Sequence, residues 1–590
     1  MIFLVAILIC FFISGCSAQT IYSQDQFDEV IERARNEESV NIRLLPGSYH
    51  LNGNLKTNSS ISIIGLNATI SAYTDSYVNS DVYSETPTHY VCRLKTDLNE
   101  FSLMVDQNGK LAEISESVED SILVNKVDSI IAPEEMKKGA EIILPITDNL
   151  THLKNKTFQK AFGYFDCGWS RICFKLKTSD DRFLYCETLN STNVPRYDYE
   201  KSAYKNAIRF VLYNVEVKPN AIYFDNDLIY IPKSIEKLNV KNCNVFADAR
   251  PEIEINGDVT ISGVTFEGFN GIRIKSGVHN SCNIMDCEFK HTLGNVLSIS
   301  KKSEFDFTPA YVTRCKFEEC SLLTGTMLNL SSSYVGKKSV FVDNCEFVRY
   351  PDAKVRYKNT SAMVNVNADA HISDCRFWNT CRAHLYFTKG NSVSKDNIIY
   401  NTPDFNTPRD RNLSNDWGLI YIGSAFKNNE KSVSNHEHKV FINECFLYGA
   451  RANAKDARGI MIDNGRGDIV CRNNVVLDCQ SYTLDSRDRK KFIGTSSIRN
   501  VFENNILGGR YRLAGGDSVP KKDRPVSRNN ILLGVYKNVF NDNANIESSN
   551  KVIPVDYKVK DGFIYVGNSE YDSLHKFSSF EKVKKYIIKK

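Results

Sequence analysis

Three aspartates stand beside two short apolar segments in the second half of the chain. Asp416 and Asp456 each come four residues before such a segment, at 420–423 and 460–463, and Asp463 ends the second one. Hydrolysis of a glycosidic bond uses two carboxyl groups, one protonated and one ionised, roughly 5 to 9.5 Å apart. Adjacent β-strands lie about 4.8 Å apart, so neighbouring strands can supply such a pair. The three aspartates are therefore candidate catalytic residues.

A second reaction fits the basic residues around the same segments. Elimination from a uronate needs a cation that neutralises the substrate carboxylate and a base that removes the C5 proton. Lys455, Arg458, Arg466 and Tyr421 suit these roles, and Ca2+ is an expected cofactor only for such a lyase. Further candidates for substrate binding are Asp468, Asp485, Arg510 and Arg512.

These residues also have structural explanations. Asp463 begins the sequence Asp-Asn-Gly, which is well suited to a turn at the end of a strand. Asp416 and Asp456 can cap turns, and Arg510 and Arg512 can belong to a solvated strand face. The sequence leaves the structural and the functional explanations open.

Aromatic residues occupy equivalent positions in the same region. Aligning 385–388 with the two apolar segments puts Tyr386, Tyr421 and Met461 in one outward column. Trp417 can stack on a sugar ring or pack under a loop. This outward strand ledge is the predicted binding site for a polysaccharide or oligosaccharide.

Repeated strand-turn units must position these residues. Short apolar strands recur from about residue 234 to 533, and many end in a pattern such as Asp-Asn-Cys-Glu-Phe. A recurring unit of this length is the signature of a solenoid. The longest interval between units, from Asn397 to Cys445, falls beside the predicted ledge, and long loops on one face usually build the binding side. The repeated position is occupied by Cys243, Gly263, Cys287, Cys315, Cys345, Cys375, Asn397, Cys445, Asn474, Asn505 and Asn530.

Between these positions lies a second kind of strand, which alternates apolar and polar residues as in NGIRIKSG and GTMLNLS. Strands of this kind have one buried and one wet face, and stacking them turn upon turn makes a parallel β-helix. The repeated cysteines are then expected inside the coil, and the asparagines that follow them are expected to form a hydrogen-bonded ladder. Disulfides between Cys315 and Cys320, or between Cys375 and Cys381, remain open.

The N-terminal region fits the same architecture. Ser23 and Gln26 form a capping box, and Phe27, Val30, Ile31 and Ala34 follow with helical spacing, which predicts one amphipathic helix that covers the end of the coil. With the LPGSYHL and IIGLNATI steps and the later repeats, the chain resembles the pectate-lyase-like right-handed β-helix superfamily. That resemblance implies a polysaccharide lyase, a glycoside hydrolase or a non-catalytic glycan binder.

An insertion interrupts the repeats between about residues 90 and 232. Asn108-Gly109 and the segment around Asp225–Asp227 predict hairpins of an antiparallel β-domain, whose order is similar to the β-sandwich insertion of bacterial β-helical glycoside hydrolases. The expected fold is all-β: a right-handed parallel β-helix with an N-terminal capping helix and this inserted domain. The predicted segments are 1–16, a signal peptide; 21–89, the cap and first turns; 90–232, the insertion; 233–545, the β-helix; and 546–590, a C-terminal cap.

The first residues predict export. Residues 2–13 are almost wholly apolar, too few to span a bilayer comfortably, and lead into Ile-Ser-Gly-Cys, which resembles the lipobox of bacterial lipoproteins. The resemblance implies that Cys16 is lipidated and anchors the protein in the bacterial cell envelope, facing the periplasm or the outer surface. An ordinary cleavage after Ala18 is the alternative.

Composition and missing motifs limit the function. With 74 basic and 70 acidic residues, a net charge of +4 does not indicate a nucleic-acid partner. His436 and His438 have the spacing of a metal pair but no evident third ligand, so no metal site is predicted. The polygalacturonase pattern of paired aspartates and a full lyase signature are both absent. A glycoside hydrolase is the favoured function, and a polysaccharide lyase and a non-catalytic glycan-binding protein are the alternatives.

Overall fold

The computed structural model describes most of the repeated units and parts of the insertion. The described residues are 18–71, 89–95, 100–106, 111–115, 122–124, 137–146, 151, 153–158, 162–167, 170–189, 210–212, 222–224, 227–229, 252–269, 271–276, 281–290, 292, 295–301, 308–321, 326–332, 340–350, 362–380, 383–402, 417–423, 439–450, 457–462, 468–479, 482–486, 499–514, 524–533, 540–542, 545–546, 549–553, 556–560, 563–567 and 575–577.

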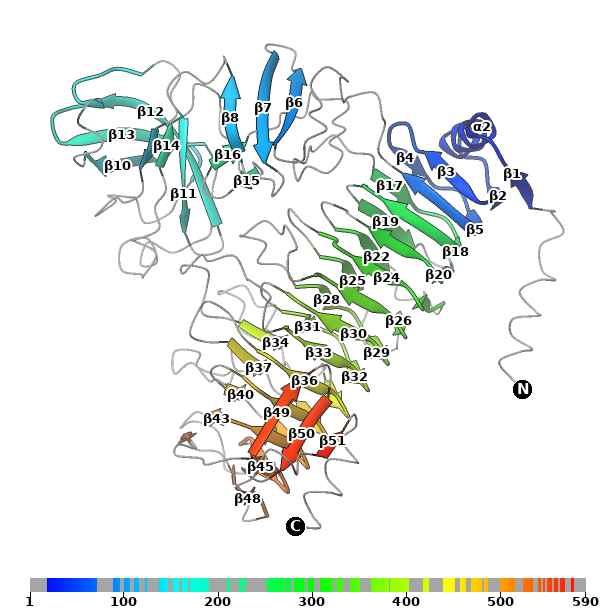
Figure 1. The fold of residues 1–590 in the computed structure, drawn as a ribbon, viewed down its shortest axis with the longest axis vertical. Coiled ribbons are helices and arrows are strands. Elements are labelled where there is room, and N and C mark those ends of the chain that lie inside the picture. The colour runs from blue at the N-terminus through cyan, green and yellow to red at the C-terminus, as the bar shows by residue number, and fades with distance from the viewer. Residues whose placement is uncertain are drawn as a thin grey trace.

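Short strands wind into a coil whose turns each add one strand to three parallel stacks (Figure 1). Stacks 1 and 2 form one large sheet, and stack 3 forms a twelve-stranded sheet of its own in the described chain. The predicted parallel β-helix is confirmed. The strands alternate buried and half-buried residues, as in β20 (Cys282–Met285), because one face of each strand points into the coil.

The stacks contain the following strands. Stack 1 holds β1 (Gln19–Ile21), β2 (Val40–Leu44), the first part of β5 (Ile61–Ser71) and of β18 (Val259–Glu267), β20, β23 (Ala310–Thr313), β26 (Val340–Asp343), β29 (Ala370–Ser373), β32 (Ser392–Lys395), β35 (Val440–Asn443), β38 (Ile469–Arg472), β41 (Val501–Glu503), β44 (Val526–Arg528) and β47 (Asn545–Ile546). Stack 2 holds β3 (Gly47–His50), the second part of β5 and β18, β21 (Glu288–Lys290), β24 (Lys316–Glu318), β27 (Glu346–Val348), β30 (Arg376–Trp378), β33 (Ile398–Tyr400), β36 (Phe446–Tyr448), β39 (Val475–Leu477), β42 (Ile506–Gly508), β45 (Ile531–Leu533) and β48 (Lys551–Ile553). Stack 3 holds β4 (Leu55–Thr57), β17 (Glu252–Ile255), β19 (Gly271–Ser276), β22 (Leu297–Lys301), β25 (Leu328–Ser332), β28 (Val364–Asn367), β31 (Leu385–Lys389), β34 (Trp417–Ile422), β37 (Ala457–Ile462), β40 (Tyr482–Ser486), β43 (Arg510–Ala514) and β46 (Phe540–Asp542).

A sharp bend joins the strand of stack 1 to the strand of stack 2 in each turn. The residue at the bend has a left-handed backbone, with φ between 51° and 58° from Asp286 to Asn529. Asn and Asp tolerate this conformation better than other residues that carry a side chain, which explains why they recur there. The bend turns the residue that follows it, the repeated cysteine or asparagine, into the coil.

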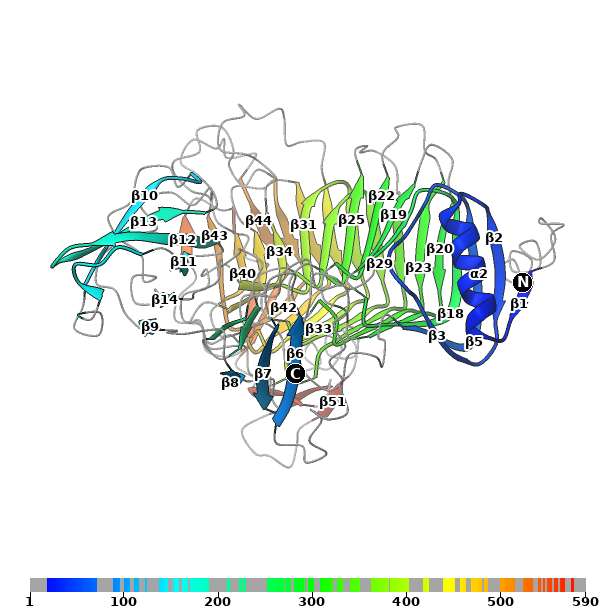
Figure 2. The same cartoon turned by 90° about the horizontal axis from the view of Figure 1, so that it is seen from above.

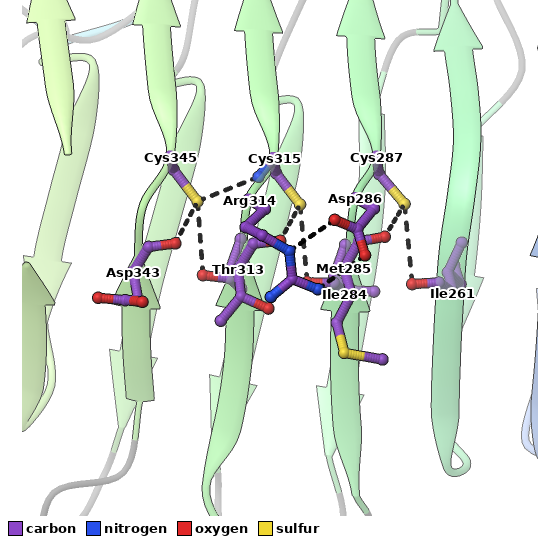
Figure 3. A network of polar contacts seen from close by, with 11 residues as sticks. Ile261, Ile284, Met285, Asp286, Cys287, Thr313, Arg314, Cys315, Asp343 and Cys345 are labelled. Carbon is purple, nitrogen blue, oxygen red and sulfur yellow. Dashed lines mark hydrogen bonds and ion pairs between the residues drawn. The ribbon is translucent and has the colours of Figure 1, made fainter. Parts of the chain in front are cut away.

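These repeated residues form a ladder along the inside of the coil. The thiols of Cys287, Cys315 and Cys345 each donate to a strand carbonyl of the preceding turn, 3.4 to 3.7 Å away (Figure 3). The backbone N–H of Cys315 in turn donates to the sulfur of Cys345, at 3.4 Å. Asn474 continues the ladder, because its Oδ1 accepts from Cys445 N at 2.9 Å and its Nδ2 donates to Ile442 O at 2.7 Å. Cysteine and asparagine thus make the same two bonds, one accepted and one donated.

The predicted burial of the repeated cysteines is confirmed for the described ones. Cys287, Cys315, Cys345, Cys375 and Cys445 are at most 1% exposed, and Cys243 lies outside the described residues. Cys315 and Cys320 are both free thiols, so the disulfide considered between them is not formed. Cys375 is also free, and Cys381 is not described.

The N-terminal helix and the first turns agree with the sequence analysis. Helix α2 (Gln24–Arg35) starts at Ser23, whose side chain accepts from Gln26 N, and it buries Phe27, Val30, Ile31 and Ala34. The helix lies at the end of the coil, against β2, β3 and β4 (Figure 2). It therefore shields the apolar interior of the first turns from water.

The chain leaves the coil after β5 and re-enters it at β17. β5 pairs directly with β18, although almost 190 residues separate the two strands in sequence. The strands between them are antiparallel: β6 (His89–Lys95), β7 (Glu100–Asp106) and β8 (Leu111–Ser115) in one sheet; β10 (Glu141–Pro145), β13 (Phe183–Thr188), β12 (Ser170–Ser179) and β11 (Phe162–Cys167) in another; and the pairs β9 (Ile122–Val124) with β14 (Phe210–Leu212) and β15 (Ile222–Phe224) with β16 (Asp227–Ile229). The β7–β8 and β15–β16 hairpins are the two that the turn sequences predict.

The C-terminal part contains an antiparallel sheet. It consists of β49 (Asp556–Lys560), β50 (Phe563–Gly567) and β51 (His575–Phe577). The short basic helix expected near the end of the chain lies outside the described residues. No helix among the described residues is long and apolar enough to cross a membrane.

A buried histidine in the coil is expected to make the protein less stable in acid. His384, immediately before β31, is 0% exposed, and its Nε2 lies 3.1 Å from Tyr400 O. Burial lowers the pKa of His384, and the charge of Arg349 adds to this effect, whereas the hydrogen bond to Tyr400 raises the pKa. Together these effects bring the pKa of His384 to about 3. The unfolded chain protonates this ring near pH 6.5, so the folded state should lose about 1.4 kcal/mol per pH unit as the pH falls from about 6.5 toward 3.

We therefore expect His384→Gln to flatten the decline of the thermal unfolding midpoint between pH 7 and pH 4.5. Glutamine can still donate to Tyr400 O but does not titrate. His371→Gln is the matched control, since His371 lies half-buried in β29 and stacks on Phe341. Equal pH slopes for the wild type and His384→Gln would show that His384 does not contribute.

Candidate functional site

The outward column predicted from the sequence exists in stack 3. Tyr386 of β31 pairs with Tyr421 of β34, and Tyr421 pairs with Met461 of β37. The register continues from Met461 to Asp485 of β40 and from Asp485 to Arg512 of β43. One row across five adjacent strands therefore carries two tyrosines, a methionine, an aspartate and an arginine.

The first three residues of this row are packed together. The rings of Tyr386 and Tyr421 meet edge to face, with centroids 4.9 Å apart and planes at 73°. Tyr421 is 4% exposed and Met461 is 0% exposed, and both belong to a small apolar cluster with Ala362 and Ala383, outside the core of the coil. Tyr386 packs against this cluster and is only partly buried. Of the two described aromatic residues of the row, Tyr386 is the one that is not fully buried.

Gly423, which follows β34, makes room for the tyrosine pair. A Cβ atom at Gly423 would lie 2.9 Å from Tyr421 Cε1 and 3.0 Å from both Cε2 and Oη of Tyr386. Real Cβ atoms essentially never show the 2.9 Å approach and rarely show the two at 3.0 Å, so a side chain here must displace at least one ring. The Tyr386 ring therefore reaches over the C-terminal end of β34.

Gly423→Ala is accordingly expected to destabilise the protein by about 1–3 kcal/mol, the usual cost of overpacking, and to lower the thermal unfolding midpoint. In a Tyr386→Ala background the same change should cost less than half as much, because two of the three close atoms are gone. An undiminished cost in that background would mean that Tyr386 does not occupy this space.

The three candidate aspartates adjoin described strands but lie outside the described residues. Asp416 directly precedes Trp417 and Asp456 directly precedes Ala457, and these two following residues pair with each other. Asp463 follows Ile462, which pairs with Ile422. Since β37 spans about 17 Å, Asp456 and Asp463 adjoin opposite ends of it. The candidates therefore belong to two groups: Asp416 and Asp456 directly precede strands of stack 3, and Asp463 directly follows one.

The other predicted residues are distributed as follows. Arg458 lies within β37 rather than in a loop, is 0% exposed, and places Nη1 3.5 Å from Met461 Sδ. Asp468 forms an ion pair with Arg499 at 2.8 Å, and Arg510 is exposed at the start of β43. The backbones of Trp417, Asp485 and Arg512 are described but their side chains are not. Lys455, Arg466 and Cys16 lie outside the described residues, as do His436 and His438.

The small residues that make room for the side chains of this site were not predicted from the sequence. Ala362 and Ala383 each come just before a strand of stack 3, and Gly423 follows β34. Their role is to leave space for Tyr386, Tyr421 and Met461, and the recurrence of a small residue beside a strand was the available signal. No group of three metal-ligating side chains is found among the described residues.

Comparison with known proteins gives no family. No family model matches the chain, and no curated protein matches it. Similar solved structures include a glycoside hydrolase (12% identity, TM-score 0.42, covering 82% of this chain and 91% of that one) and XylC in complex with xylose (10%, 0.37, 89% and 83%). Another is the tailspike protein gp49 from Pseudomonas phage LKA1 (10%, 0.26, 90% and 78%). At these TM-scores the similarities add nothing to what the chain's own structure shows.

Proposed function

We propose that the protein is a carbohydrate-active β-helix protein that hydrolyses glycosidic bonds on the outer face of stack 3. The observation that carries the proposal is the row of Tyr386, Tyr421, Met461 and Asp485 on adjacent strands. It combines a partly exposed aromatic ring, on which a sugar can stack, with a carboxyl group two strands beyond Tyr421.

The register supports one carboxyl pair in particular. Asp485 pairs with Met461, and Asp463 directly follows β37, two residues after Met461 in the sequence. A strand continued to residue 463 would bring its Cα atom to roughly 8 Å from that of Asp485, within the separation that glycosidases use. We assign Asp463 and Asp485 as the catalytic pair, since the Tyr386 ring reaches toward this end of the strands. Asp416 and Asp456, beside Trp417 at the opposite end, are the second candidate pair.

The burial of Arg458 favours hydrolysis over elimination. A lyase needs a cation that contacts the substrate carboxylate at the surface, and Arg458 is 0% exposed and lies against Met461. Of the basic residues considered for that role, only Lys455 and Arg466 remain as candidates. A lyase and a non-catalytic glycan binder are therefore the alternatives that an assay must exclude.

A screen of the purified protein against plant, algal and host polysaccharides tests the proposal. Reducing ends and ultraviolet absorbance are read together, because a lyase creates an unsaturated product that absorbs and a hydrolase does not. Reducing ends without absorbance are expected. Reducing ends with absorbance would identify a lyase, and binding without reducing ends would identify a glycan-binding protein.

We also propose export and anchoring through a lipidated Cys16. The support is the apolar leader followed by Ile-Ser-Gly-Cys. The full chain should partition into the detergent phase of a Triton X-114 extract when expressed in a bacterium, and Cys16→Ala should abolish that partitioning. Equal partitioning of the two proteins would refute the anchor.

A further inference from the structure

A groove lies on the outer face of the four-stranded sheet in the insertion, away from the residues assigned to catalysis. Its volume is about 340 Å³, within the range of small-molecule sites. Glu141 of β10, Lys177 and Thr178 of β12, and Tyr185 and Glu187 of β13 line it. These side chains come from three adjacent strands, so the sheet itself positions them.

Tyr185 is held as a rigid platform in this groove. Its hydroxyl donates to Asp180 Oδ2 at 2.7 Å, and Asp180 Oδ1 accepts from the backbone N–H groups of Arg182 and Phe183, each at 2.7 Å. The same bond to Asp180 raises the pKa of Tyr185, so the phenol stays neutral. Since the hydroxyl is already engaged, the ring surface is what Tyr185 offers to a ligand.

The charged groups beside the platform suit an uncharged ligand with many hydroxyls. Glu141 and Glu187 are directly opposite each other on paired strands, and Lys177 Nζ lies 2.5 Å from a Glu187 oxygen. Lys177 lowers the pKa of Glu187, which keeps that carboxyl group ionised. Ionised carboxylates accept hydrogen bonds from neighbouring hydroxyls, and the ammonium group donates. Lys175, which pairs with Glu187 across the strands, and Lys177 together balance the two carboxylates, so the groove has no net charge that would select an anion.

We propose that this groove is a second saccharide-binding site, which takes a neutral sugar unit with its ring against Tyr185 and its hydroxyls toward Glu141 and Glu187. The choice of ligand class rests on the proposed function, whereas the groove is separate from the catalytic row. Such a site would hold the protein on a polymer while the coil cleaves it.

Affinity electrophoresis of the full chain in gels that contain neutral polysaccharides tests this site. The wild type should be retarded by at least one of them, and Tyr185→Ala should raise the dissociation constant at least about tenfold, the effect of losing one stacking contact. Glu187→Gln should also weaken retardation, whereas Tyr185→Phe should retain most of it. Lys154→Ala, an exposed change in the same domain but outside the groove, is the control and should behave as wild type.

The outcomes separate this proposal from the proposed function. Hydrolysis of a short soluble oligosaccharide should be unchanged in Tyr185→Ala if both proposals hold. Three results would refute the saccharide-binding site, whatever the hydrolysis assay shows. They are unchanged retardation of Tyr185→Ala, retardation by acidic polysaccharides alone, and no retardation at all. If retardation depends on Tyr185 but no reducing ends are released, the groove binds saccharide and the protein is not a hydrolase.

Discussion

Asp463→Asn is expected to reduce turnover of the cleaved polysaccharide about a thousandfold while leaving its binding nearly unchanged. Loss of a positioned acid or base removes roughly 10²–10⁴-fold of rate, and asparagine keeps the size of the side chain without its proton chemistry. Asp485→Asn should have an effect of the same order, because hydrolysis needs both carboxyl groups. Initial rates of reducing-end release and a separate binding assay give the two quantities.

Two further variants test whether the loss of turnover is specific to Asp463 and Asp485. Asp286→Asn is the structural control, because Asp286 forms an ion pair with Arg314 at the bend between stacks 1 and 2 and should leave turnover within about twofold. Asp456→Asn tests the other end of β37. A large loss in Asp456→Asn with full activity in Asp463→Asn would move the catalytic pair to Asp416 and Asp456 and contradict our assignment.

Asn505→Val is expected to destabilise the coil by about 3 kcal/mol or more. Asn505 is 1% exposed; its Oδ1 accepts from Asn474 N, and its Nδ2 donates to Cys471 O and to Asn530 Oδ1, all between 2.9 and 3.0 Å. Valine fills the space but leaves these buried groups without the side-chain partner, at about 1–3 kcal/mol each. The shift of the chemical denaturation midpoint measures the loss.

Asn505→Cys is the matched variant for this position. Cys345 and Cys375 occupy the equivalent position in other turns. There the sulfur accepts a hydrogen bond from a backbone N–H and the thiol donates to a carbonyl. Cysteine should therefore recover at least half of the stability that valine loses. Equal losses for the two variants would mean that the ladder contributes through packing rather than through hydrogen bonds.

The sequence predicted the parts of the fold that repeat. The position after each bend must be small enough to fit the coil and able to both donate and accept, so cysteine and asparagine mark every turn of it from Cys287 to Asn530. The strand alternation likewise gave the pairing of Tyr386, Tyr421 and Met461, because residues of stacked parallel strands keep one register. Helix α2 was predictable from its cap and its apolar spacing.

The environment of the candidate site was not predictable in the same way. Alternation shows which side chains point outward, but not which of them are covered, so the burial of Tyr421, Met461 and Arg458 had no sequence signal. Cys315 and Cys320 remain free thiols because they lie on either side of β24 in the same turn. The spacing of two cysteines in the sequence does not show this. The location of the groove at Tyr185 depends on the pairing of β10 with β13, in which Glu141 lies opposite Glu187, 46 residues later in the chain.

A crystal structure of the Asp463→Asn protein with a bound oligosaccharide of the cleaved polymer would show directly whether Asp463 and Asp485 form the catalytic pair. We expect a sugar ring against Tyr386 and a glycosidic oxygen between residue 463 and Asp485, on the outer face of β37 and β40. A saccharide bound beside Trp417, or only in the groove at Tyr185, with the row from Tyr386 to Asp485 empty, would contradict it.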